Sequence, residues 1–129
     1  EAECIRIRDI RRFVESRLGQ RMKKAAMKKH LYREQPFVIQ RSASMLDDGW
    51  KNETVLVQGI IDAYFMEEEE IVLVDYKTDR VRRGQEQKLI DLYHVQLEDY
   101  ARALERMTGK KVKEKIIYSF SLGKIIEVG

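Results

Sequence analysis

Two apolar segments that both run into an aspartate constrain the fold of this chain more than any other feature. Val55–Ile61 precedes Asp62, and Ile71–Val74 precedes Asp75. Both segments are rich in β-branched residues, which is typical of buried strands. The acidic run Glu67–Glu70 lies between them and predicts the loop of a hairpin. The sequence therefore places two carboxylates in strands where a packed sheet normally holds apolar side chains.

The hairpin register brings these two carboxylates together. Antiparallel pairing around the loop sets Met66 opposite Ile71 and, by the same count, Asp62 opposite Asp75. Lys77 follows two residues later and lies on the same face. Carboxylates roughly 5 Å apart repel by about 3 kcal/mol at an effective dielectric near 20, so the pattern predicts a cation between them. The alternative is a buried ion-pair cluster of Lys77 with both aspartates and no metal.

The rest of the chain predicts a single mixed α/β domain over residues 1–129. Gly59 indicates either a bulge, which would shift the register by one, or a close backbone approach. Periodicity and turn residues predict the other elements: a helix over 9–26 with Asp9 as its N-cap, an edge strand over 32–39 containing Pro36, a turn-rich loop over 42–52 containing Trp50, a helix over 89–107 ended by Gly109, and strands over 112–120 and 125–128.

Composition excludes several kinds of site. The chain has 129 residues, 25 Lys and Arg, 22 Asp and Glu, and one cysteine, Cys4. An internal disulfide, a four-cysteine zinc site and an iron–sulfur cluster held by this chain alone are therefore excluded. No apolar run approaches the roughly 20 residues of a membrane span, and we expect a cytoplasmic protein. Basic clusters over 21–29, 80–83 and 110–115 either suit a polyanion or form ordinary solvated surfaces.

Asp62, Asp75 and Lys77 are the residue types that magnesium-dependent phosphodiester hydrolysis requires, because Mg²⁺ prefers carboxylate and phosphate oxygens and a nearby lysine stabilises developing negative charge. Four motifs in order resemble the PD-(D/E)XK nuclease superfamily in its RecB-like form, and most closely the nuclease domains of the AddA family of bacterial helicase-nucleases. They are Arg33–Phe37, Val57–Asp62, Val74–Asp79 and Gln96–Tyr100, followed by a similar terminal strand over Lys113–Gly123.

The resemblance implies a restriction-endonuclease-like fold with a mixed sheet flanked by helices, and a role for each matching residue. Asp62 and Asp75 are expected to bind Mg²⁺, for which Mn²⁺ substitutes, with Lys77 as the catalytic lysine. Glu34 is expected near the site, binding the metal through water or orienting another group. Gln96 and Tyr100, one helical turn apart, are expected to face the site or the DNA, although Tyr100 also continues an apolar stripe and Gln96 could bond to backbone.

The family also uses a histidine ligand on an upstream helix, and neither His30 nor His94 matches that context. We expect this ligand to lie before Glu1, in a larger parent protein of which the chain is a C-terminal fragment, and we expect the fragment alone to be weakly active or inactive.

The implied activity is that of an exonuclease domain in a bacterial ATP-dependent helicase-nuclease that acts in double-strand-break repair by recombination. Its partners would be a DNA single strand delivered by the helicase, the rest of the parent protein and a second nuclease-helicase subunit. The alternatives are a non-catalytic DNA-binding or structural module of the same fold, and a stand-alone junction-resolving or restriction-type endonuclease, which would act as a symmetric dimer.

Overall fold

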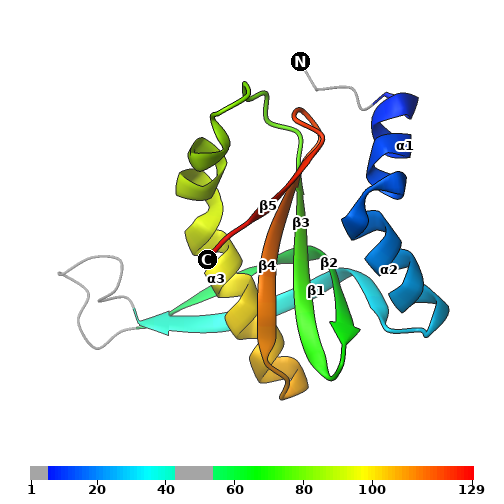
Figure 1. The fold of residues 1–129 in the computed structure, drawn as a ribbon. Helices are drawn as coiled ribbons and strands as arrows, with labels where there is room; N and C mark the ends of the chain where they lie inside the picture. Colours follow the sequence, from blue (N-terminus) through cyan, green and yellow to red (C-terminus); the bar gives the residue numbers. More distant parts are fainter. Residues whose placement is uncertain (1–5, 43–53) are drawn as a thin grey trace.

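The computed structural model describes residues 6–42 and 54–129, which form a sheet between two layers of helices (Figure 1). Cys4 and the segment around Trp50 lie outside the described residues. The helices are α1 (Ile7–Glu15), α2 (Arg17–Met27) and α3 (Glu86–Thr108), and the strands are β1 (Leu31–Ser42), β2 (Thr54–Glu67), β3 (Glu70–Lys77), β4 (Val112–Ser119) and β5 (Lys124–Glu127). No helix in the described part of the chain is long and apolar enough to cross a membrane.

The five strands form one mixed sheet in the order β1-β2-β3-β4-β5. All neighbouring pairs are antiparallel except β3 and β4, which run parallel and are joined through α3. This arrangement confirms the predicted mixed sheet flanked by helices. It also confirms that β1, which contains Pro36, is an edge strand, where a residue without an amide hydrogen breaks no ladder.

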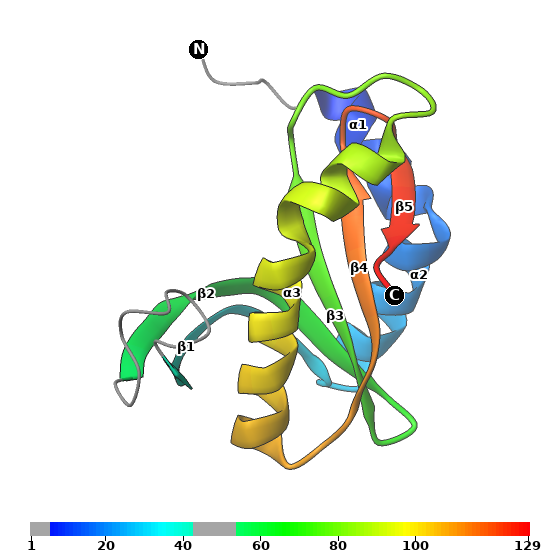
Figure 2. The ribbon, with the colours of Figure 1, turned by 90° about the vertical axis from the view of Figure 1, so that its left-hand side faces the viewer.

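Each face of the sheet has its own apolar core. On one face, α3 packs through Leu97, Tyr100 and Leu104 against strand residues that include Ile71 and Leu73. On the other face, α2 packs through Leu18 and Met22, and α1 contributes Phe13, which contacts Tyr76, Tyr118 and Phe120 edge-on or tilted. Successive residues of β3 alternate between the two cores, as the twofold period of a strand requires. Figure 2 shows α3 crossing one face of the sheet.

The helix predicted over 9–26 is in fact two helices that meet at Ser16. The Ser16 backbone is extended, and its hydroxyl donates to the Phe13 carbonyl at 2.6 Å and accepts from the Gly19 amide at 3.0 Å. Gly19 permits this turn, because a Cβ there would lie 2.2 Å from the Phe13 carbonyl oxygen. The expected N-cap was also wrong: α1 begins at Ile7, and the Asp9 carboxylate reaches back to the Arg6 amide from inside the first turn.

The central hairpin keeps the predicted register but has a shorter loop. Met66 pairs with Ile71, as expected, but Glu67 also pairs with Glu70, so that only Glu68 and Glu69 form the turn. Both turn residues have positive φ, 52° and 71°, which is the two-residue turn whose twist matches antiparallel strands. Gly59 causes no shift, since the β1–β2 pairing is continuous in register on either side of it. The Phe37 ring approaches it closely, and a Cβ at Gly59 would lie 3.1 Å from that ring.

The sheet forks between β2 and β3. Their pairing extends from the hairpin turn only as far as Ala63 and Val74. Beyond that point β2 pairs with β1 alone, and the end of β3 pairs with β4. The β1–β2 arm therefore swings away from the rest of the sheet, as Figures 1 and 2 show. The two aspartates singled out in the sequence lie at this fork.

Candidate active site

Asp62 and Asp75 are the first residues beyond the last β2–β3 pair. Because the strands separate here, the Tyr76 amide has no ladder partner on β2, and it donates instead to Asp62 Oδ2 at 2.8 Å. Asp75 stays in the sheet and pairs with Ile117 of β4. At the fork, the Asp62 carboxylate therefore accepts a hydrogen bond that a backbone carbonyl would accept in a continuous ladder. This bond holds Asp62 next to Asp75.

The Asp75 carboxylate is buried and poorly compensated. Only 3% of Asp75 is exposed, and its Oδ2 has no hydrogen-bond donor among the described residues. Lys77 Nζ lies 2.9 Å from this oxygen as an ion pair that lacks hydrogen-bond alignment. Burial raises the pKa of Asp75 to about 6; Lys77 opposes the rise and the nearby Asp62 carboxylate adds to it. The predicted repulsion between the two aspartates is therefore present in the structure.

Lys77 is held between its own strand and α3. Its ammonium forms the ion pair with Asp75 described above. It also donates to Gln96 Oε1 at 3.1 Å and lies 3.9 Å from the centre of the Tyr93 ring. Gln96 thus faces the site rather than a backbone group, which was the alternative considered for it. Tyr93 was not predicted from the sequence as a site residue. The signal that could have found it is its spacing, since it precedes Gln96 by three residues and shares that helix face.

Tyr100 belongs to both the core and the site. Its ring packs edge-on against Phe37 with centroids 5.1 Å apart, within the apolar cluster on the α3 face. Burial, followed by the charges of Asp75 and Asp62, raises the pKa of Tyr100 to about 12, so its hydroxyl lies within the field of both carboxylates. The two predicted interpretations of this residue are therefore compatible.

Glu34 lies on β1, opposite Asp62 of β2, and its side chain is exposed. The register places it between the pairs Arg33–Ala63 and Gln35–Ile61, and its φ of 51° is left-handed, which costs a non-glycine residue roughly 1 kcal/mol. The strand changes face here: Leu31 packs with the α1–α2 core, whereas Phe37 and Ile39 pack with the α3 core. This irregularity lies at the same level of the sheet as the fork between β2 and β3.

The donor set at the fork fits a divalent cation. Two carboxylates lie side by side, one of them buried so that its charge is disfavoured, and oxygen ligands of this kind are those that Mg²⁺ and similar hard cations prefer. Among the described residues no group of three or more histidine, cysteine or acidic side chains could hold a metal. Asp62 and Asp75 are the residues at the fork that would hold the ion. His30 and His94 are exposed. Neither takes part in the hydrogen bond between Tyr76 and Asp62 or in the ion pair between Lys77 and Asp75.

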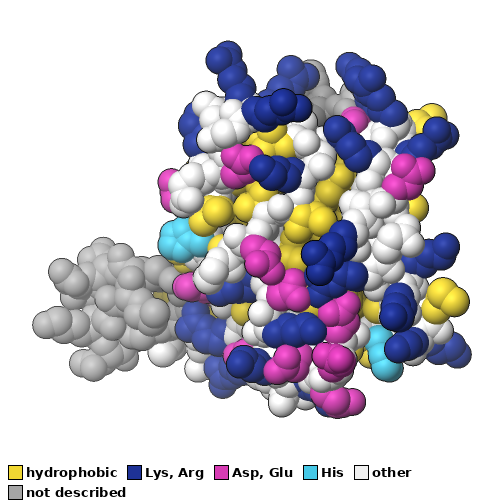
Figure 3. Space-filling view, in the orientation of Figure 1, with side chains coloured by type: hydrophobic (Ala, Val, Ile, Leu, Met, Phe, Trp, Pro, Cys, Tyr) yellow, Lys and Arg dark blue, Asp and Glu magenta, His cyan; other side chains and the backbone are white. Residues whose placement is uncertain are grey.

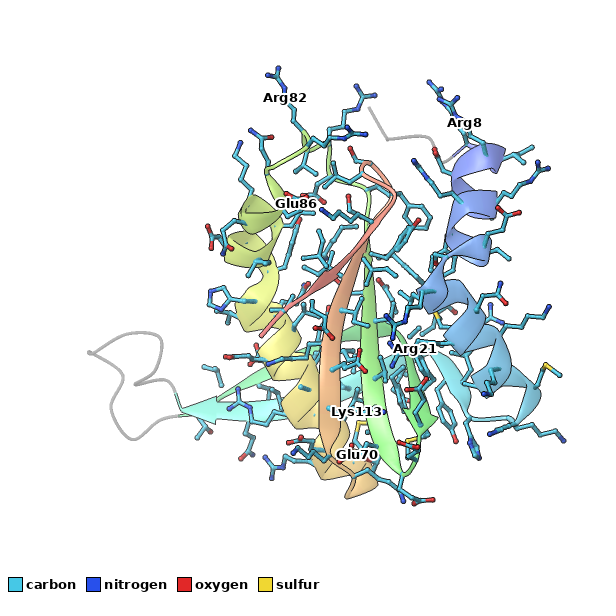
Figure 4. The ribbon with its side chains drawn as sticks, in the orientation of Figure 1. Arg8, Arg21, Glu70, Arg82, Glu86 and Lys113 are labelled. Carbon is cyan, nitrogen blue, oxygen red and sulfur yellow. The ribbon has the colours of Figure 1, made fainter. Side chains whose placement is uncertain are left out.

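The side chains of the predicted basic clusters fall into two kinds: those that form ion pairs within the fold and those that are exposed. Arg21 and Lys113 are bound to glutamates within the fold, so these members have a structural partner. The loop directly after Lys77 instead exposes Arg80, Arg82 and Arg83. Lys and Arg side chains gather at this end of the molecule, over the start of α1 and the loop after β3 (Figure 3). Arg8 and Arg82 project outward there (Figure 4).

Comparisons with known proteins agree with this geometry. A family model described as the PD-(D/E)XK nuclease superfamily matches residues 5–125. Proteins named as one subunit of an ATP-dependent helicase/nuclease are similar over nearly the whole chain: that of Acetivibrio thermocellus is 46% identical and that of Thermoanaerobacter sp. 44% identical, each over 98% of this chain. The protein of the same name from Clostridium novyi is 40% identical over 99% of it. The chain spans 10% of the length of these relatives. This chain belongs to the PD-(D/E)XK nuclease superfamily.

Proposed function

We propose that this chain is the nuclease domain of an AddA-type helicase/nuclease and that it hydrolyses DNA phosphodiester bonds with Mg²⁺ held by Asp62 and Asp75. The observation that carries the proposal is the buried Asp75 carboxylate, which lies beside Asp62 and whose charge the single ion pair with Lys77 does not fully compensate. A fold does not keep two such carboxylates together for stability, whereas a bound cation offsets their repulsion. Mn²⁺, with similar ligand preferences, is expected to substitute for Mg²⁺.

When bound, the cation supplies charge neutralisation at the phosphate and a lower pKa for the attacking water. Lys77 donates an N–H from Nζ to a phosphate oxygen or to the attacking water, stabilising the negative charge that develops there. Gln96 fixes the direction of that ammonium through its 3.1 Å hydrogen bond. Tyr100 limits water access to the carboxylates with its buried ring, and Glu34, at the exposed side of the arm, binds the metal through water or orients a second group.

The substrate is proposed to be a DNA single strand delivered by the helicase part of the parent protein. Exposed Arg80, Arg82 and Arg83 follow Lys77 directly in the chain, so phosphates next to the scissile one can be bound by this loop. The names of the relatives support a parent with helicase activity and at least one further subunit. Degradation of DNA ends in recombinational repair, in the bacterial cytoplasm, is the role that follows.

The test is cleavage of a labelled single-stranded DNA by the full-length protein with Mg²⁺, with Mn²⁺ and with EDTA. Asp62→Asn and Asp75→Asn are expected to lower the cleavage rate by about 10³-fold while ATP hydrolysis by the helicase part is kept. Wild-type cleavage rates in both variants would refute the assignment. Loss of cleavage in EDTA, with DNA binding retained, separates a metal-dependent nuclease from a non-catalytic DNA-binding module, which would bind without cleaving in any buffer.

A further inference from the structure

The Lys77 ammonium has an aromatic neighbour that neither the family motifs nor the proposed chemistry assigns. A lysine side chain has four rotatable bonds, so the strand alone does not fix where its nitrogen lies. Here Nζ has three protein neighbours: Asp75 Oδ2 at 2.9 Å, Gln96 Oε1 at 3.1 Å and the Tyr93 ring centre at 3.9 Å. Two of the three come from α3, one helical turn apart.

The Tyr93 ring is itself held in place. Its hydroxyl donates to Asp79 Oδ2 at 2.7 Å, and this bond, together with burial and the charge of Asp79, raises the pKa of Tyr93 to about 12. Asp79 and Lys77 are alternate residues of the segment that leaves β3. One tyrosine therefore meets that segment at two points, with its ring face toward Lys77 and its hydroxyl toward Asp79. A ring that only filled the core would need neither contact.

We propose that Tyr93 is a positioning residue that holds the Lys77 ammonium at the carboxylates through its ring face, with Asp79 fixing the ring. The inference rests on the proposed function, in which Lys77 acts on the phosphate or the attacking water. A ring face attracts a cation, and more strongly where water is partly excluded. Unlike a further carboxylate, it does so without neutralising the ammonium, so the charge of Lys77 stays available to the substrate.

The test compares kcat and KM for single-stranded DNA in the full-length protein and its variants. Tyr93→Leu removes the ring face and is expected to lower kcat by about 10- to 100-fold with KM nearly unchanged, because a misplaced group costs rate rather than binding. Tyr93→Phe keeps the ring face but removes the hydroxyl that Asp79 holds, and Asp79→Asn weakens the same bond. Both are therefore expected to lie between Tyr93→Leu and the wild type, with Tyr93→Phe no higher than Asp79→Asn. His94→Ala, an exposed neighbour on α3, is the matched control and should match the wild type.

A structural readout separates positioning from a general packing defect. In the 129-residue chain, NMR signals of the Lys77 Cε protons are expected upfield of those of the other lysines, because they lie against the ring. Tyr93→Phe should keep this shift, and Tyr93→Leu should lose it while the signals of the two apolar cores remain. If Tyr93→Leu does not fold, Tyr93→Phe and Asp79→Asn still decide: wild-type kcat in Asp79→Asn together with loss of kcat in Tyr93→Phe would overturn a role for the ring face.

The two proposals fail in different ways. Unchanged cleavage by Lys77→Ala would refute the proposed function itself. Loss of cleavage in Lys77→Ala, with wild-type kcat and an unchanged Lys77 signal in Tyr93→Leu, would refute only the positioning role of Tyr93.

Discussion

Two clusters in this molecule, each of which brings carboxylates and basic side chains together, balance their charges in opposite ways. In the Arg21 cluster, formed by Arg21, Glu67, Lys113 and Glu114, two cations meet two carboxylates. Arg21 donates to both glutamates at 2.7–3.1 Å and joins α2 to the strands (Figure 4). In the fork cluster, formed by Asp62, Asp75, Lys77 and Gln96, the cation pairs with Asp75, and the second carboxylate, Asp62, adds to the negative charge beside it.

The pKa values of the carboxylates separate the two clusters. Hydrogen bonds from Arg21 lower the pKa of Glu67 to about 2, which means that the fold stabilises its charge. Burial raises the pKa of Asp75 to about 6, which means that the fold disfavours its charge. The comparison teaches that ion pairing alone does not identify a functional site. Unbalanced charge in a buried place is the stronger indication of a candidate site, because a bound cation would restore the balance.

The largest expected effect is a difference in DNA cleavage rate between Lys77→Ala and Lys113→Ala, which change two lysines that each contact a carboxylate. Lys77→Ala should lower DNA cleavage by the full-length protein by about 10³-fold, since it removes a donor at the reacting phosphate. Lys113→Ala breaks the 3.2 Å contact with Glu67 and should leave cleavage within about twofold. The measurement is the single-turnover cleavage rate with Mg²⁺. Equal losses in the two variants would mean that the clusters do not differ in function.

The next largest effect is expected in stability, from Arg21→Leu. This change leaves Glu67 and Glu114 facing each other without their shared cation, and it should lower the free energy of unfolding by about 3 kcal/mol. Urea unfolding at pH 7 measures it. Arg17→Leu, at an exposed position on the same helix, is the control and should change the free energy by no more than about 0.5 kcal/mol.

Asp75→Asn should have the opposite effect to Arg21→Leu: in EDTA it should raise the free energy of unfolding. Because the folded-state pKa of Asp75 is raised from 3.8 to about 6, stability falls as the pH rises through this range. Asparagine mimics the neutral acid, so its gain should reach about 3 kcal/mol well above pH 6 and vanish below about pH 4. Thermal unfolding from pH 4 to 8 measures the gain. Destabilisation at every pH would show that the ion pair with Lys77 outweighs the burial of Asp75.

The smallest effect is expected from Glu67→Gln. The folded-state pKa of Glu67 is lowered from 4.5 to about 2, so its contribution is present above pH 4.5 and is lost as the pH falls toward 2. The side chain is 29% exposed, and solvent screening reduces the loss at pH 7 to about 1 kcal/mol. The variant and the wild type should converge in acid. Glu68→Gln, in the exposed turn, is the control and should match the wild type at every pH.

The sequence was sufficient for the parts of the fold that depend on local pattern. The hairpin register followed from two apolar runs around an acidic turn, and the end of α3 from Gly109, whose φ of 73° only glycine adopts without cost. The proximity of Asp62 and Asp75 followed from the same register. These features need only neighbouring residues along the chain, which is why periodicity and turn chemistry predict them.

Features that neither the apolar pattern nor a typical turn residue signals could not be predicted in this way. The break at Ser16 interrupts a continuous apolar period, and it is accompanied by the hydrogen bonds of the Ser16 hydroxyl with Phe13 and Gly19 and by the close approach of Gly19 to the Phe13 carbonyl. The two-residue turn uses Glu68 and Glu69, neither of which is a residue that favours positive φ. The contact of Lys77 with Tyr93 depends on where α3 lies over the sheet, and no pattern within either segment reports that.

The fork between β2 and β3 also sets the order in which the site assembles. The hairpin that brings Asp62 toward Asp75 closes a short loop, and such local contacts form early in folding. The contacts that direct Lys77 come from α3, and the parallel partner of β3 is β4, which is synthesised later still. In a chain that folds during synthesis, the aspartate pair would therefore form before α3 directs its lysine, and the proposed chemistry would have to wait until the last strands join the sheet.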